Sequence, residues 1–221
     1  MKVLFLGDSL TSAENNNYKG FVEKLRLQFF ENKGVSGSTI GDYSLYPVGN
    51  TDLLSSTFKY KDIIAKSDYL FIEYGINDIA SATIGYTTNN YICITLNKCI
   101  DNIYQINKNI KIVYLLPTLE SKVLSEIAKS QYDYLKEYLD EEIVGDKEDF
   151  IKFYMNNYYS LVKFITRKKL NILTLIDNVD VYRNYLDVDM IHPNDKGYQI
   201  IADKLRKELT TQYEDFNNWI K

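Results

Sequence analysis

This 221-residue chain contains short apolar runs that alternate with segments of helical periodicity. Of all its sequence features, this alternation limits the possible fold classes most strongly. We predict that these runs, which are apolar throughout, form buried strands. The predicted strands are Val3 to Leu6, Gln28 to Glu31, Tyr69 to Tyr74, Lys111 to Leu116 and Ile172 to Ile176. Buried strands that alternate with helices predict an α/β fold, a five-stranded parallel sheet covered by helices on both faces.

Helical spacing of apolar side chains marks the segments between these runs. An amphipathic helix is predicted by Tyr18, Phe21, Val22 and Leu25, and a last long helix by Tyr198, Ile201, Ala202, Leu205 and Leu209. A further helix is expected over Ile92 to Asn107. The stretch from Ser121 to Lys169 has no strand signal, and we expect two or three helices there, broken near Gly145. This stretch is interpreted as a helical insertion on the sheet.

Composition places the chain among ordinary globular proteins, because 45% of its residues are apolar and 25% are charged. Without an internal repeat or a Pro/Gly-rich linker, residues 1–221 are predicted to form a single domain. The net charge of −4 and the lack of a basic stripe argue against a nucleic-acid partner. Cys93 and Cys99, six positions apart on a predicted helix, are expected to be free thiols.

The chain shows no pattern of export or membrane insertion. No apolar run is long enough to span a bilayer, and the first residues lack a secretory leader. We therefore expect a cytoplasmic protein, although a chain trimmed of its leader would look the same. The oligomeric state cannot be predicted, and the tail from Tyr213 to Lys221 can either extend the last helix or contact a partner.

Three polar or glycine positions follow successive predicted strands. Ser9 follows the first, Gly37 the second and Asn77 the third. Sites of open parallel sheets form outside the carboxyl ends of the strands, so these residues are expected to meet at one edge. Taken alone, a serine after Gly-Asp is more often a turn or a helix cap. Their shared edge is what indicates a site.

His192, the single histidine, lies in Asp189-Met190-Ile191-His192-Pro193. In a turn, Asp189 is close enough to accept a hydrogen bond from one ring nitrogen, which leaves the other free to take a proton. A serine nucleophile needs such a base, because its hydroxyl is hardly ionised at neutral pH. The backbone amides of Ser9 and Gly37 and the side chain of Asn77 can stabilise an oxyanion, at roughly 3–4 kcal/mol for one donor.

Four segments, in this order, resemble the conserved blocks of the SGNH (GDSL) hydrolases. They are Gly7-Asp8-Ser9-Leu10, Gly37 within its glycine-containing loop, Gly75-Ile76-Asn77-Asp78 and the Asp189 to Pro193 segment. The resemblance implies a flavodoxin-like three-layer α/β/α fold without metal or cofactor. It also implies Ser9 as nucleophile, His192 as base, Asp189 as its orienting partner, and Ser9, Gly37 and Asn77 as the oxyanion hole. It does not cover residues 121–169.

Several functions are compatible with these residues. A serine esterase can remove acetyl groups from a carbohydrate, with tyrosines of the helical insertion either stacking on sugar rings or filling the core. It can also act as a lysophospholipase or thioesterase on longer acyl chains, or as an acyltransferase. A ligand-binding module on an esterase scaffold is the non-enzymatic alternative. The α/β-hydrolase motif Gly-x-Ser-x-Gly and the phosphate-binding glycine motifs are absent, and the acidic run from Asp177 to Asp189 lacks regular metal-ligand spacing.

Overall fold

The computed structural model describes residues 1–13, 19–43, 45, 52–186 and 192–220. Its sheet has five strands in the order β2-β1-β3-β4-β5, and every neighbouring pair is parallel. The strands are β1 (Val3–Gly7), β2 (Phe30–Asn32), β3 (Tyr69–Glu73), β4 (Lys111–Leu116) and β5 (Asn171–Thr174). The predicted α/β fold with a five-stranded parallel sheet is confirmed.

The strand ends differ from the prediction most clearly at β2. The strand begins at Phe30, two residues after the predicted start, and pairs with β1 at Val3. Leu27 forms an antiparallel bridge with Ile220, and the Gln28 amide donates to the Trp219 carbonyl. The C-terminal tail therefore returns to the chain just before β2 and does not extend the last helix, which is α11 (Asp195–Gln212).

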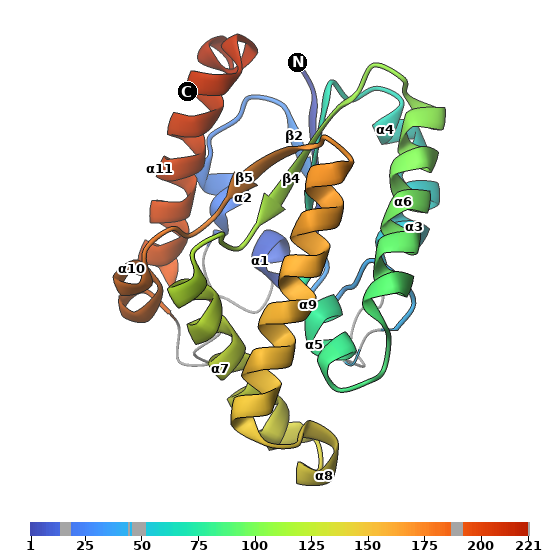
Figure 1. Ribbon diagram of the computed structural model, residues 1–221. Coiled ribbons are helices and arrows are strands. Elements are labelled where there is room, and N and C mark those ends of the chain that lie inside the picture. The colour runs from blue at the N-terminus through green and yellow to red at the C-terminus, as the bar shows by residue number, and fades with distance from the viewer. Residues whose placement is uncertain (14–18, 44, 46–51, 187–191, 221) are drawn as a thin grey trace.

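Helices cover both faces of the sheet, and Figure 1 shows α11 and α6 (Asn89–Ile106) on opposite sides of it. In the layer of α6 lie α3 (Leu53–Lys59) and α4 (Lys61–Ile64), both in contact with α6. In the layer of α11 lie α2 (Phe21–Lys24) and the 3₁₀ helix η1 (Glu214–Asn218). The helix predicted from Tyr18 to Leu25 is thus a single turn in the structure, and Tyr18 lies outside the described residues.

Three helices connect β4 to β5, in agreement with the two or three that were expected over residues 121–169. They are α7 (Ser121–Tyr138), α8 (Glu141–Val144) and α9 (Lys147–Arg167), with the break at Gly145. Asp146 begins α9 by accepting from the amides of Glu148 and Asp149. Because adjacent parallel strands need a crossover, α9 fills that role and packs on α5 (Ile76–Thr83) and α6. The added part is α7 with α8, below the sheet in Figure 1.

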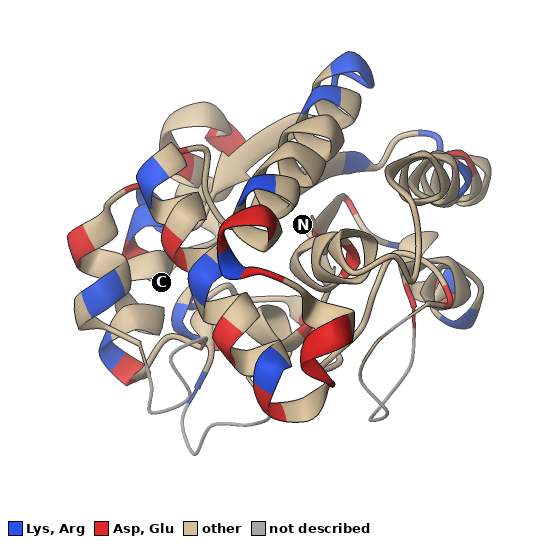
Figure 2. Ribbon diagram, turned by 60° about the horizontal axis from the view of Figure 1, so that its bottom comes forward, with Lys and Arg blue, Asp and Glu red and all other residues tan. Residues whose placement is uncertain are grey.

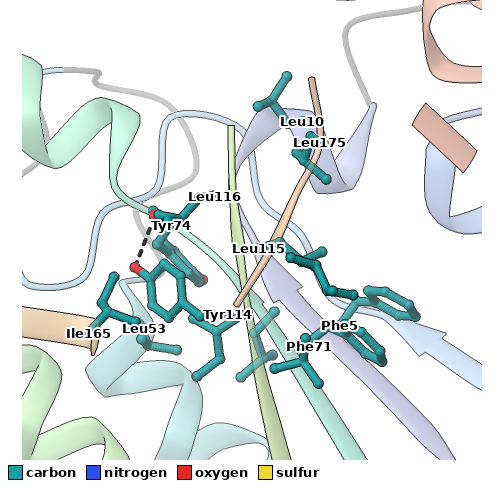
Figure 3. Close-up of a cluster of buried hydrophobic side chains, with 14 of the residues drawn as sticks. Phe5, Leu10, Leu53, Phe71, Tyr74, Tyr114, Leu115, Leu116, Ile165 and Leu175 are labelled. Carbon is teal, nitrogen blue, oxygen red and sulfur yellow. Dashed lines mark hydrogen bonds between the residues drawn. The ribbon is translucent and has the colours of Figure 1, made fainter. Parts of the chain in front are cut away.

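The core lies between the sheet and the two helical layers. Phe5 of β1 and Phe71 of β3 stack with ring centroids 4.8 Å apart, as Figure 3 shows. Tyr114 of β4 is fully buried, and its hydroxyl donates to the Tyr74 carbonyl at 2.9 Å, the dashed line of Figure 3. That bond offsets the cost of burying a phenol hydroxyl in an apolar core.

Both cysteines are free thiols, as predicted, with Cys99 buried and Cys93 half-buried. Positive and negative side chains are interspersed over the helices in Figure 2. Within the described part of the chain, no helix combines the length and the apolar character that a bilayer span requires.

Candidate active site

Ser9 stands at the carboxyl end of β1, as the first residue of α1 (Ser9–Ser12). Asp8 precedes the helix and caps it, because its Oδ1 accepts from the Leu10 amide at 3.0 Å. Gly7 makes this sharp exit from the strand possible. A Cβ at Gly7 would lie 2.1 Å from Thr11 Oγ1 and 2.8 Å from the Glu73 carbonyl oxygen, so no larger residue fits.

His192 reaches Ser9 from the other end of the chain. Its Nε2 lies 2.7 Å from Ser9 Oγ, and both side chains are partly exposed to solvent. The turn that carries His192 is held by Asn194, which caps α11 by accepting from the Gly197 amide at 3.0 Å and donates to the Leu186 carbonyl at 3.1 Å. The predicted serine–histidine pair is therefore within hydrogen-bonding distance.

Asp189, the predicted partner of His192, lies outside the described residues. The backbone on either side of its segment is fixed by an antiparallel bridge between Leu186 and Pro193. The role of Asp189 stays a prediction.

Gly37 and Asn77 line the same cavity as Ser9 and His192. Gly37 has a φ of 75°, a left-handed conformation that glycine adopts without steric cost. Asn77 is buried in the first turn of α5, and its Nδ2 donates to the Ser38 carbonyl at 2.9 Å and faces Asp8 Oδ2 at 3.4 Å. The structure thus brings together the loop ends that the sequence places at one edge of the sheet.

Asp78 fixes the loop that follows Gly37. Its Oδ1 accepts from the Ile40 amide at 2.8 Å and from the Tyr43 hydroxyl at 2.6 Å. The carboxyl is fully buried, and burial raises its pKa to about 7. Together with the bond from Asn77 to Ser38, these contacts tie the start of α5 to the loop around Gly37.

Sequence reasoning missed a further buried carboxyl, which lies next to Asp8. Glu73, the last residue of β3, is 1% exposed, and its side chain hydrogen-bonds with that of Asp8. Thr11 Oγ1 donates to Glu73 Oε2 at 3.0 Å. Burial raises the pKa of Asp8 to about 6 and that of Glu73 well above the usual value. A signal was present, because Glu73 is the one charged residue within the apolar run of β3.

The cavity next to Ser9 measures about 450 Å³, a size typical of small-molecule sites. Apart from the residues at its catalytic end, its walls are mostly apolar and come from α7, the end of β5, α10 (Val179–Asn184) and α11. They include Ile127, Leu135, Leu139, Leu175, Ile176, Tyr182 and Ile201. Among the described residues, no three His, Cys, Asp or Glu side chains are grouped to hold a metal ion.

The tyrosines of residues 121–169 divide between two roles. Tyr132, Tyr154 and Tyr158 are buried in the core. Tyr134 and Tyr138, one helical turn apart on α7, line the cavity with ring centroids 4.8 Å apart. The core interpretation is therefore correct for the first three tyrosines, whereas stacking of Tyr134 and Tyr138 on sugar rings stays a prediction.

Comparison with known proteins identifies the family of this chain. Residues 5–200 match the model of the GDSL-like lipase/acylhydrolase family. The chain belongs to this family. It is therefore a GDSL-type ester hydrolase, as the four sequence blocks predict. A search of curated proteins found no match to the sequence.

Several solved structures share the fold of this GDSL-type hydrolase. Est24, a carbohydrate acetylesterase from Sinorhizobium meliloti, aligns with a TM-score of 0.62 and 14% identity over 96% of this chain and 100% of its own. The inhibitor-bound aryl esterase of M. smegmatis aligns with a TM-score of 0.61 and 14% identity over 96% of this chain and 99% of its own. The acetyl xylan esterase AlAXEase aligns with a TM-score of 0.55 and 18% identity over 95% of this chain and 100% of its own. At these identities the likeness concerns the fold.

Proposed function

We propose that this protein hydrolyses carboxylic esters of medium-length aliphatic acids through an acyl-enzyme on Ser9. The observation that carries the proposal is the 2.7 Å contact between Ser9 Oγ and His192 Nε2 at one end of an apolar cavity. A neutral imidazole at this distance accepts the hydroxyl proton as the oxygen attacks.

The reaction proceeds in two balanced steps. Ser9 Oγ bonds to the ester carbonyl carbon while His192 Nε2 takes its proton, and the departing alkoxide then receives that proton as the C–O bond breaks. Water attacks the acyl-enzyme by the same route, which releases the acid and restores Ser9. Asp189 is proposed to accept from the other ring nitrogen, and Asp8 adds negative charge near the imidazolium that forms.

The oxyanion is proposed to bind the amides of Ser9 and Gly37 and the side chain of Asn77. One hydrogen of the Asn77 amide is used by the Ser38 carbonyl at 2.9 Å. The other faces Asp8 across 3.4 Å, a long contact that a closer oxyanion can replace.

The acyl group is proposed to enter the apolar cavity. An acetyl group would leave most of these walls uncovered, whereas each further methylene that becomes buried contributes about 0.8 kcal/mol. The cavity therefore favours longer acyl chains over the acetyl group.

A second candidate is an acetylesterase that acts on carbohydrates. Tyr134 and Tyr138 support it, because two neighbouring rings at the cavity can stack on sugar faces, and Tyr138 is 66% exposed. Est24 and AlAXEase, which share the fold, bear the names of acetylesterases. In this case the cavity would hold part of the sugar and only a short acyl group.

The first experiment is intact-mass analysis after treatment with a fluorophosphonate, on wild type and Ser9→Ala side by side. We expect one adduct on the wild type and none on the variant, because only an activated hydroxyl reacts. An equal adduct on Ser9→Ala would refute Ser9 as the nucleophile.

The same preparations then separate the two substrates by p-nitrophenyl esters of increasing chain length. For the medium-chain esterase, kcat/KM should rise about fourfold per methylene from acetyl onward, which corresponds to about 0.8 kcal/mol, until the cavity is full. A maximum at acetyl would favour the carbohydrate acetylesterase.

A further inference from the structure

Glu73 has no part in the acyl-transfer steps above, yet it is buried next to Asp8, the residue that precedes Ser9, and its carbonyl accepts from the Asp8 amide at 3.1 Å. Both carboxyl groups are 1% exposed, and their side chains hydrogen-bond to each other. Two carboxylates cannot share a hydrogen bond, since neither has a proton to donate. One of the two must therefore be protonated.

The neighbours of each oxygen indicate which residue carries the proton. Asp8 is positioned as an acceptor, since Oδ1 receives the Leu10 amide at 3.0 Å and Oδ2 faces the Asn77 amide at 3.4 Å. Glu73 Oε2 accepts from Thr11 at 3.0 Å, whereas its Oε1 has no donor among the described residues. A proton on Glu73 Oε1 satisfies that buried oxygen and supplies the donor that the hydrogen bond between the two carboxyl groups requires.

We propose that Glu73 is a positioning residue of the esterase: as an un-ionised carboxylic acid it donates a hydrogen bond to Asp8 and thereby holds the helix cap that carries Ser9. This inference rests on the proposed role of Ser9 as nucleophile. Glu73 is not among the residues that line the cavity, and it acts on Ser9 through Asp8 and Thr11, which flank Ser9 in the chain. Gly7 is needed for this arrangement, because its missing Cβ leaves the space in which the Thr11 side chain reaches Glu73.

The proton on Glu73 also matters for the charge beside the oxyanion hole. With Glu73 neutral, the pair carries one negative charge, already hydrogen-bonded from two sides. If both were ionised, two buried charges would lie next to each other near the oxyanion hole and repel the oxyanion that forms there. A neutral Glu73 therefore keeps a second negative charge away from the oxyanion hole.

The test compares two neutral replacements of similar length, Glu73→Gln and Glu73→Met. The glutamine amide can still donate to Asp8, and we expect kcat to stay within about fivefold of wild type. The methionine cannot donate, and we expect kcat to fall on the order of 10- to 100-fold with KM within about threefold, because the misplaced group acts in the transition state. A folded Glu73→Met with wild-type kcat would overturn the positioning role.

Infrared spectroscopy tests the protonation itself, without any turnover. At about pH 8 an ordinary carboxyl is ionised, so a carboxylic-acid C=O band should come from Glu73. We expect the band in wild type and in Asp78→Asn, its absence in Glu73→Gln, and a shift in Thr11→Val, which removes the hydrogen bond to the carbonyl oxygen. A wild-type spectrum without the band would overturn the proposal even if Glu73→Met fails to fold.

Fluorophosphonate labelling keeps the two proposals apart. If the wild type shows the band but is not labelled at Ser9, the proposed nucleophile fails while the protonated Glu73 stands. If Ser9 is labelled in the wild type and equally fast in Glu73→Met, the nucleophile stands and the positioning role fails.

Discussion

At the residue scale, this site is held together by hydrogen bonds to carboxyl groups that are buried. Asp78 accepts from Ile40 and Tyr43 through one oxygen, while its Oδ2 is buried without a partner among the described residues. An ionised Asp78 therefore costs free energy in the folded state, and burial raises its pKa from 3.8 to about 7.

This raised pKa predicts a specific pH dependence of stability. A carboxyl with a raised folded-state pKa stabilises most below its unfolded pKa, and that contribution is lost as the pH rises through about 7. Asp78→Asn keeps the acceptor oxygen but cannot ionise. The difference in free energy of unfolding between Asp78→Asn and wild type should therefore shift in favour of the variant by on the order of 3 kcal/mol from about pH 5 to pH 8. Urea titrations at both pH values measure this, and a difference independent of pH would contradict the assignment.

At the element scale, strand ends and helix starts place the site, and this is also what the sequence predicts best. Ser9, Gly37 and Asn77 follow β1, β2 and β3, and order along parallel strands is enough to bring them to one edge. Contacts between elements are harder to foresee. The link between Glu73 and Thr11 joins β3 to α1, and the antiparallel bridge of Leu27 to Ile220 spans nearly the whole chain. Neither has a local sequence signal that names its partner.

The turn before α11 offers a test of how an element start holds His192. Asn194 both caps α11 and donates to the Leu186 carbonyl. Asn194→Ala removes both functions and should cost about 1 kcal/mol of stability through the lost cap. Asn194→Asp keeps the cap but not the donor to Leu186.

We expect both Asn194 variants to lower kcat several-fold, and only the alanine variant to lower the melting temperature. Thermal melts and ester kinetics on the same preparations measure the two effects. A wild-type kcat in Asn194→Asp would show that the cap alone holds the turn.

At the scale of the whole molecule, the connection from β4 to β5 adds a cavity wall to the site at the edge of the sheet. The crossover needs only α9, and α7 is the helix that runs beside α10 and supplies one wall of the cavity. The sequence predicts helices in this region but not their place, because the apolar side chains of α7 can face a core or a cavity equally well. Ile127 and Leu135 do both, being buried and lining the cavity.

If the cavity holds the acyl chain, ligands that fill it should stabilise the fold in proportion to their length. Alkylboronic acids bond reversibly to an activated serine and carry a chain of chosen length into the acyl position. Each added methylene should tighten binding by about 0.8 kcal/mol, or about fourfold. At a fixed saturating concentration, the melting temperature should therefore rise by roughly 2–3 °C per methylene until the cavity is full. Ser9→Ala is the control and should lose most of the shift. Equal shifts for methyl- and pentylboronic acid on the wild type would mean that the chain stays outside the walls formed by α7 and α11.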